Sequence, residues 1–248
     1  MAAGKTRNFP TSTKMAQHRG QPACFTWNMA AAEPPTPVLQ SPAMNAPSMK
    51  LLVFAGSTRQ QSFNRRLAAV AAQIGRAAGA QVTLLELADF DIPMYHADLE
   101  ARGTPADVIR LKEIMDAHPA WIIASPEYNG SYTGLLKNTL DWASSPVAGH
   151  PVFADGSRPF AGKVVGMLSA SNGALGGLRA QGHLAPLLIN LGCWLAPRQY
   201  ALARAASAFD EHGALPDAAQ HEQVQAVVRQ VLWAAARLHG AASAPESA

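Results

Sequence analysis

Short apolar runs alternate with longer segments of helical spacing from residue 49 onward. The run Leu51-Leu52-Val53-Phe54 is continuously apolar, as is typical of a strand that is buried on both faces. In the segment after it, apolar residues recur three and four positions apart, which is the spacing of one helix face. The same alternation predicts strands at 50–55, 81–87, 120–125, 163–169 and 193–202. It predicts helices at 62–78, 106–117, 133–143, 216–238 and, after a glycine-rich loop at 172–177, up to about residue 191.

Strands that alternate with helices build a parallel sheet covered on both faces, because each right-handed crossover returns the chain along one face. Five strands in this pattern predict an α/β fold, a three-layer sandwich with a five-stranded parallel sheet of flavodoxin-like order 2-1-3-4-5. In that order the switch point of the sheet lies between the first and third strands. The two loops richest in polar residues and glycine follow those same strands, which favours a ligand site there.

Composition supports one globular domain at residues 49–240. The chain has 248 residues, 48% of them apolar and 15% charged, which is enough for a sizeable core. The formal net charge of +3 comes from residues 1–48, which hold four basic residues and one acidic residue. The remaining 200 residues hold 16 of each sign, so we expect no nucleic-acid partner for the folded part.

The ends of the chain differ from this domain in composition. Residues 1–48 are rich in Pro, Ala, Ser, Thr and Met without a sustained period, and we expect a disordered tail or an over-called translation start. Residues 241–248 are expected to be a disordered C-terminus. No apolar run reaches the roughly 18–20 residues of a membrane span, so no membrane partner is expected.

The cysteines and histidines predict neither a disulfide framework nor a metal site. Cys24 lies in the tail and Cys193 in an apolar run, which favours a reducing compartment, the cytoplasm. None of the eight histidines has metal-ligand spacing to another His or Cys, so no metal is expected.

The loop after the first strand, residues 56–64, has the donors that a phosphate needs. Gly56 permits a tight exit from the strand, and the free N–H groups of the next helix favour an anion. Hydroxyl, amide and guanidinium donors come from Ser57, Thr58, Arg59, Ser62 and Asn64. The patterns G-x-G-x-x-G and G-x-x-x-x-G-K-[ST] are absent, which favours a monophosphate over a pyrophosphate or triphosphate. The alternative is that Ser62 only caps the helix and that Arg59 is solvated.

A second polar loop follows the buried run at 120–124. It carries Ser125-Pro126-Glu127-Tyr128-Asn129-Gly130 before a helix that begins near Thr133. Pro126 sets the direction of the chain, and glycines let the backbone approach a flat ligand closely. In an open α/β sheet, a loop of this kind at the carboxyl end of a strand forms a pocket.

Taken together, these loops resemble the NADPH-dependent FMN reductase family, the flavodoxin-like quinone, azo and chromate reductases. The first two motifs are Gly56-Ser57-Thr58-Arg59-x-x-Ser62-Phe63-Asn64 and Pro126-Glu127-Tyr128-Asn129, continued by Gly134-Leu135-Leu136-Lys137-Asn138-x-x-Asp141-Trp142. A third segment agrees, Gly162-Lys163 followed by Ser169-Ala170-Ser171-Asn172-Gly173-x-x-Gly176-Gly177. The resemblance covers roughly residues 49–205, and the first two motifs are specific as a pair.

The resemblance implies a tightly bound FMN. By this likeness, the FMN phosphate lies against Ser57, Thr58, Arg59, Ser62, Phe63 and Asn64. The isoalloxazine ring is lined by Pro126, Glu127, Tyr128, Asn129 and Gly130, largely through backbone groups. The other side of the flavin is closed by Ser169, Ala170, Ser171 and Gly173. Gly130 departs from the pattern, because family members often carry a bulkier residue there.

The resemblance also implies an activity: hydride passes from NADPH or NADH through FMN to a small acceptor, with no catalytic side chain of its own. The acceptor is a quinone, an azo compound, chromate or free flavin. A homodimer or homotetramer is expected, because a neighbouring subunit often completes the flavin site in this family. The alternatives are an FMN electron carrier and a flavin-binding redox sensor. Carriers tend to be strongly acidic, whereas residues 49–248 are neutral overall.

Two questions stay open at the level of sequence. Arg102, Arg158 and Arg179 are all candidates for a contact with a 2′-phosphate, and their spacing selects none of them. Gly176 and Gly177 serve either close helix packing or a contact with the flavin edge or a partner chain.

Overall fold

A computed structural model describes residues 48–240, so the predictions for the two chain ends fall outside the described residues, apart from residue 48. The sheet has the order β2-β1-β3-β4-β5, with β6 also paired to β4, and all pairs are parallel. The strands are β1 (Lys50–Ala55), β2 (Gln81–Leu85), β3 (Ala120–Ala124), β4 (Val164–Ala170), β5 (Trp194–Leu195) and β6 (Tyr200–Leu202). The predicted strand order is therefore confirmed.

The predicted fifth strand, 193–202, is divided into β5 and β6. Leu195 pairs with Val165 and Tyr200 with Leu168, so four residues on this strand lie opposite two on β4. Pro197 lies in this bulge and has no N–H to donate to a ladder, which explains the interruption. The next amide, on Arg198, donates to the side chain of Gln230 at 2.7 Å instead.

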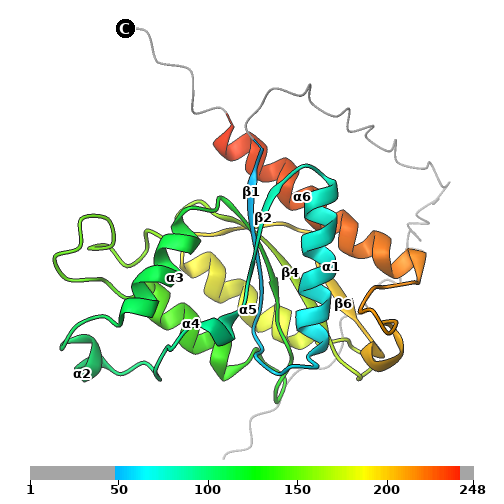
Figure 1. The fold of residues 1–248 in the computed structure, drawn as a ribbon, viewed down its shortest axis with the longest axis horizontal. Helices are drawn as coiled ribbons and strands as arrows, with labels where there is room; N and C mark the ends of the chain where they lie inside the picture. Colours follow the sequence, from blue (N-terminus) through cyan, green and yellow to red (C-terminus); the bar gives the residue numbers. More distant parts are fainter. Residues whose placement is uncertain (1–47, 241–248) are drawn as a thin grey trace, which may run out of the picture. The chain divides into compact units, whose positions relative to one another are not determined.

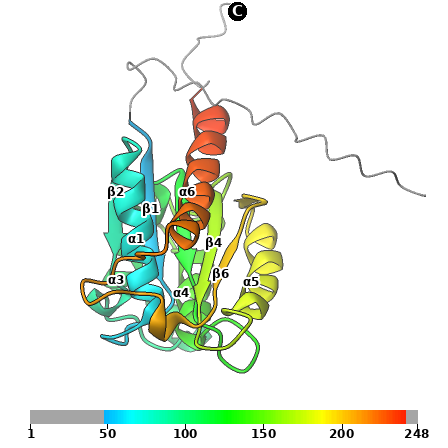
Figure 2. The ribbon, with the colours of Figure 1, turned by 90° about the vertical axis from the view of Figure 1, so that its right-hand side faces the viewer.

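Helices cover both faces of the sheet, as Figure 1 and Figure 2 show. The α-helices are α1 (Phe63–Ala77), α2 (Ala97–Glu100), α3 (Ala106–Asp116), α4 (Gly134–Ser144), α5 (Leu178–Asn190) and α6 (Ala218–His239). Short 3-10 turns are η1 (Leu87–Asp89) and η2 (Ala205–Ser207). One buried cluster joins α1 and α6 to the sheet, and a second joins α3, α4 and α5 to its other face. No helix between residues 48 and 240 has the length and apolar character that a membrane crossing requires.

The two apolar clusters follow from the alternation of side chains along each strand. Leu51 and Val53 face α1 and α6, whereas Leu52 and Phe54 face α3 and α4, and all four are buried. At Gly166 an added Cβ would lie 2.7 Å from Val231 Cγ2, so α6 packs onto β4 closely enough to exclude any side chain there. The continuous apolar runs in the sequence therefore correspond to strands buried on both faces.

Lys112 of α3 anchors the end of α4. Its side chain is fully buried, and Nζ donates to the carbonyl oxygens of Ala143 at 2.6 Å and Ser145 at 2.7 Å. A cation at the C-terminus of a helix is favoured by the helix dipole and by the carbonyls left without intrahelical partners. Burial in the protein interior lowers the pKa of Lys112 to about 8. This contact holds one end of α4, whose other end begins beside the predicted flavin loops.

The stabilising effect of Lys112 should depend on pH. Its folded-state pKa of about 8 lies below the ordinary lysine pKa of 10.5, so the unfolded chain binds this proton more tightly. The cost of burying the charge is therefore present below pH 8 and disappears as the pH rises toward 10.5. Relative to a Lys112→Met variant, the unfolding free energy of wild type should increase by roughly 2 kcal/mol between pH 7.5 and 10. Urea unfolding of both proteins measures this difference, and a difference that is constant with pH would contradict it.

Candidate functional site

Three loops meet at the carboxyl ends of the central strands. We call residues 56–62 the first loop, 125–133 the second loop and 171–177 the third loop; they follow β1, β3 and β4. In Figure 1 the first and second loops lie together at the lower end of the sheet. This is the switch point of the observed strand order, where α/β sheets bind ligands.

The first loop presents unpaired donors at the start of α1. Ser62 is the N-cap of α1, and its Oγ accepts from Arg65 N at 3.4 Å, so the capping alternative is observed. That bond leaves the hydroxyl proton of Ser62 free to donate. Within residues 48–240, the amides of Thr58, Phe63 and Asn64 have no hydrogen-bond partner. The side chain of Arg59 is exposed, with its guanidinium carbon 5.6 Å from the centre of the Phe63 ring.

Thr133 holds the first and second loops together, although the sequence reasoning gave it no role. Its Oγ1 donates to Gly56 O at 2.7 Å and accepts from Leu136 N at 3.1 Å, as the N-cap of α4. A Cβ on Gly56 would lie 3.2 Å from this oxygen and 3.0 Å from Leu136 Cβ. Gly56 therefore permits this close approach. A threonine directly before a helical run is the signal that identifies such a cap.

Asn64 joins α1 to the end of β4. Its Nδ2 donates to Ala170 O and its Oδ1 accepts from Ala170 N, both at 2.9 Å. The side chain is buried, with Asn64 3% exposed. The side chain predicted to contact a phosphate is thus engaged with the backbone at the start of the third loop.

The second loop contains a tight two-residue turn at Asn129-Gly130. Tyr128 N donates to Ser131 O at 2.8 Å, and Ser131 N donates to Tyr128 O at 3.0 Å. Both central residues have positive φ, 52° at Asn129 and 81° at Gly130, which is the type I′ turn that favours Asn-Gly. The turn gives a physical reason for the glycine that departs from the family pattern. Tyr128, at the base of the turn, is 57% exposed, whereas Pro126 is buried.

Glu127 joins the second loop to α5. Its carboxylate accepts from the backbone N–H of Arg179 at 3.1 Å and from Arg179 Nε at 2.7 Å. A carboxylate at the first turn of a helix is favoured by the helix dipole. Of the three arginines predicted as candidates for a contact with a 2′-phosphate, Arg179 is therefore one that lies beside the second loop. Arg158 instead pairs with Asp116, at 3.1 Å, near the amino end of β3.

The third loop is shaped by close backbone packing. A Cβ on Gly176 would lie 2.6 Å from the carbonyl carbon of Ala201, and one on Gly177 would lie 2.8 Å from Ser169 Cβ. Both glycines have positive φ, of 61° and 92°. The Ser169 hydroxyl is buried and accepts from Gln181 Nε2 at 2.8 Å, so this predicted site residue contacts α5. Close packing against neighbouring residues is therefore the predicted role of Gly176 and Gly177 that the structure shows.

Ser171 and Gly173 form the start of the third loop. Gly173 N donates to Ser171 Oγ at 3.2 Å. Ser171 N donates to Leu202 O at 3.0 Å, and Ser171 O accepts from Ala205 N at 3.1 Å. The first turn of this loop is therefore bound to β6 and η2, which restricts where its backbone can move.

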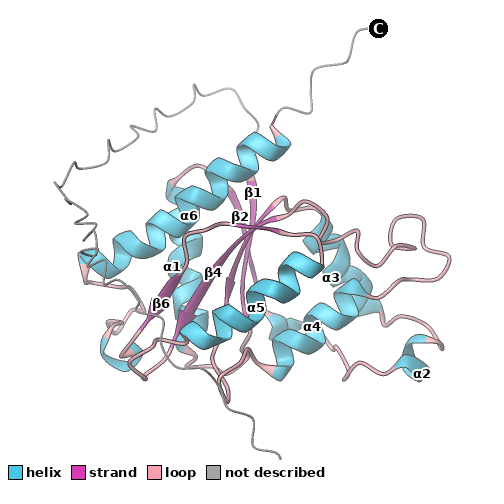
Figure 3. Cartoon of the chain, turned by 180° about the vertical axis from the view of Figure 1, so that it is seen from behind, coloured by secondary structure: helices cyan, strands magenta, loops and turns pink. Residues whose placement is uncertain are grey.

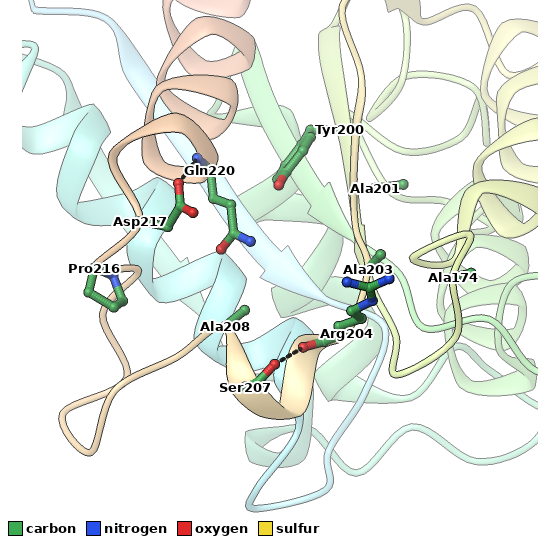
Figure 4. A pocket seen from close by; sticks show the side chains of 10 residues that line it. All are labelled: Ala174, Tyr200, Ala201, Ala203, Arg204, Ser207, Ala208, Pro216, Asp217 and Gln220. Atoms are coloured by element: carbon green, nitrogen blue, oxygen red, sulfur yellow. Dashed lines mark hydrogen bonds between the residues drawn. The ribbon is translucent and has the colours of Figure 1, made fainter.

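A separate cavity of about 480 Å³ lies between β6, η2 and the start of α6. Figure 4 shows Tyr200, Arg204 and Gln220 around it, with Ala174 of the third loop at one side. None of the predicted site residues lines this cavity. The predicted site residues therefore lie outside this cavity, which borders the third loop at Ala174.

The polar groups of the three loops fit a flavin mononucleotide. The first loop has unpaired amides, hydroxyls and an exposed cation for a phosphate. The second loop has an exposed tyrosine and, among residues 48–240, unpaired amides at Glu127 and Asn129 for the polar edge of a flat ring. A comparison with models of protein families matches residues 49–207 to NADPH-dependent FMN reductase. The chain belongs to the NADPH-dependent FMN reductase family.

Individual relatives agree with this assignment. The reductase is 37% identical over 194 residues to an NAD(P)H-dependent FMN reductase of Pseudomonas aeruginosa, covering 77% of this chain and 98% of the relative. It is 32% identical over 167 residues to a quinone reductase of Pseudomonas putida, covering 66% and 83%. Among solved structures, a flavoenzyme NAD(P)H:(acceptor) oxidoreductase from Paracoccus denitrificans matches with a TM-score of 0.65 at 27% identity, covering 76% and 98%.

Family and fold together confirm the resemblance drawn from the loop motifs. The reductase is an oxidoreductase that uses FMN as cofactor and NAD(P)H as electron donor. The individual residue assignments for FMN stay predictions, and so do the acceptor and the assembly of the chain.

Proposed function

We propose that this reductase transfers reducing equivalents from NAD(P)H through FMN to a small quinone. Support comes from relatives named quinone reductase and NAD(P)H:quinone oxidoreductase, and from the polar loops that meet at the switch point of the sheet. FMN, when bound, supplies the hydride chemistry, and the protein supplies binding and electrostatics. Azo compounds, chromate and free flavin are the other acceptor classes to be compared.

In this proposal each loop has a distinct task. The first loop holds the phosphate through its unpaired amides, the hydroxyls of Ser57, Thr58 and Ser62, and the cation of Arg59. The second loop places Tyr128 and backbone amides against the ring, in a turn that the Asn129-Gly130 pair makes rigid. Fixed amide dipoles near the ring favour negative charge that develops there during reduction. The other side of the flavin is closed by Ala170 at the end of β4 and by Ser171 and Gly173 of the third loop.

Steady-state turnover tests the proposal against the carrier and sensor alternatives. The FMN-loaded protein is mixed with NADPH or NADH and excess benzoquinone, without oxygen and without any added reductase. We expect nicotinamide oxidation at a rate far above that of an equal concentration of free FMN. Turnover only after addition of a separate reductase would support an electron carrier, and negligible turnover in both cases would support a sensor. Repeating the assay with an azo dye, chromate and free flavin ranks the acceptors.

We also propose that the chain forms a homodimer or homotetramer through α5. Large apolar side chains are exposed along α5 and at its two ends: Leu175, Leu178, Ile189 and Trp194. Figure 3 shows α5 beside α4 on the same side of the sheet, and the first turn of α5 contacts Glu127. Exposed apolar residues gathered on one element favour a protein contact.

A cytoplasmic location stays a prediction, supported by the buried free thiol of Cys193.

Charge introduced on α5 should dissociate the assembly. A Leu178→Asp, Ile189→Asp double variant is expected to sediment as a monomer, because two carboxylates would be buried in the contact. Leu238→Asp is the matched control, since Leu238 is also exposed but lies on α6, on the other face of the sheet. If wild type sediments as a monomer at micromolar concentration, or if only the control dissociates, α5 is not the interface.

A further inference from the structure

Ala170 is the point where the sheet ends and the third loop begins, and it lacks a strand neighbour on one side. Consecutive residues of a strand point their N–H and C=O groups to opposite edges. Ser171 N donates toward β6, to Leu202 O, so the polar groups of Ala170 point toward β3. The last backbone bond from that side is Ser125 N to Leu168 O, at 2.9 Å, and none joins residues 126–133 to Ala170. The chain of β3 therefore supplies no partner for Ala170.

The side chain of Asn64 takes the place of that missing strand. One amide group donates to Ala170 O and accepts from Ala170 N, both at 2.9 Å, as a neighbouring backbone would. The two residues are 106 positions apart, and both are buried. Because an unpaired buried N–H and C=O would each be costly, this contact fixes the exit of β4 relative to the first turn of α1.

We propose that Asn64 is a positioning residue, which sets the spacing between the first and third loops before FMN binds and does not itself hold the phosphate. The inference rests on the proposed function, in which those two loops enclose the flavin. Asn64 is only 3% exposed, which leaves little of its surface for a ligand. Ala170 is followed by Ser171, which is bonded to β6 and η2, so the bonds of Asn64 and Ser171 together set where the third loop begins relative to the first loop.

Asn138 offers a matched control, because it makes the same pair of bonds elsewhere. Its Oδ1 accepts from Tyr95 N at 2.7 Å and its Nδ2 donates to Pro93 O at 2.9 Å. It is 8% exposed, and it ties residues 93–95 to α4 instead of joining two of the three loops. Asn138→Ala therefore removes equivalent chemistry and reports the general cost to stability.

The decisive measurement compares FMN with riboflavin, which lacks the phosphate. For Asn64→Ala we expect both dissociation constants to rise by about tenfold, with their ratio unchanged, because the first and third loops lose the contact that sets their spacing. For Asn138→Ala we expect both constants to stay within twofold of wild type. A loss of FMN affinity with riboflavin affinity intact would make Asn64 a phosphate ligand and overturn the proposal. If Asn64→Ala does not fold, Asn64→Gln, whose longer side chain misplaces both amide groups, is judged by the same ratio.

Hydrogen exchange of the flavin-free protein provides a readout that needs no cofactor. The amide of Ala170 donates to Asn64, so in Asn64→Ala it should exchange at least about tenfold faster, while the Asn138→Ala variant leaves it unchanged. An Ala170 amide that exchanges at the same rate in wild type and Asn64→Ala overturns the proposal. If wild type binds neither flavin, the proposed function fails, and the exchange rate alone then decides whether Asn64 positions the third loop.

Discussion

Replacing Arg59 with alanine is expected to weaken FMN binding 10- to 100-fold and to leave riboflavin binding unchanged. The guanidinium is exposed beside the unpaired amides of the first loop, and within residues 48–240 it forms no ion pair. A cation free to meet the phosphate forms charge-assisted hydrogen bonds, each of which contributes about 1.5–3 kcal/mol. Because every 1.4 kcal/mol is a factor of about ten in affinity, one lost contact accounts for the expected range.

Flavin fluorescence quenching measures both dissociation constants, with Arg76→Ala as the control. Arg76 is also an exposed arginine of α1, but it lies in the last turn of that helix, far from the first loop. The effect of Arg59 should diminish at high salt, since the interaction is between exposed charges. Equal losses for FMN and riboflavin would mean that Arg59 supports the shape of the loop and does not contact the phosphate. The ratio of the two constants therefore separates Arg59 from Asn64, for which no change in ratio is expected.

Replacing Gly176 with alanine is expected to destabilise the flavin-free protein by about 3 kcal/mol. The φ of 61° costs a residue with a Cβ about 1–2 kcal/mol. The added Cβ would also lie 2.6 Å from the carbonyl carbon of Ala201 and 2.7 Å from Ala203 N, and neither is a side chain that can turn away. For a domain of this size, a loss of 3 kcal/mol lowers the Tm by about 6–12 °C.

Gly182 provides the matched control for this prediction. It lies within α5, and a Cβ there would have no atom within 4 Å. Gly182→Ala should raise the stability by about 0.5–1 kcal/mol, because alanine is the better helix former. Thermal unfolding without flavin compares the two variants. A Gly176→Ala protein as stable as wild type would mean that the third loop is free to take another backbone path, contrary to the packing observed.

Sequence reasoning succeeded where the signal was local and periodic. Continuous apolar runs located the strands, and the alternation with helices was enough to predict the order of the central strands. Each predicted helix was found with its ends shifted by no more than a few residues. Sequence reasoning failed at the split between β5 and β6, because the bulge depends on which residues of β4 pair with residues 193–202. A proline in a strand pattern indicates such a break, but the register of the partner strand decides its length.

The functional site shows the same difference between what the local sequence predicted and what only the folded structure revealed. The residue types of the first two loops predicted a phosphate site and a site for a flat ligand, and the resemblance of their motifs to a known family predicted an FMN reductase, because such motifs are encoded over short stretches of chain. The roles of Asn64, Thr133 and Glu127 became visible only in three dimensions. Each of these side chains contacts a residue 52 or more positions away. Short-range spacing carries no information about such pairs, since folding alone brings their hydrogen-bonding groups within reach of one another.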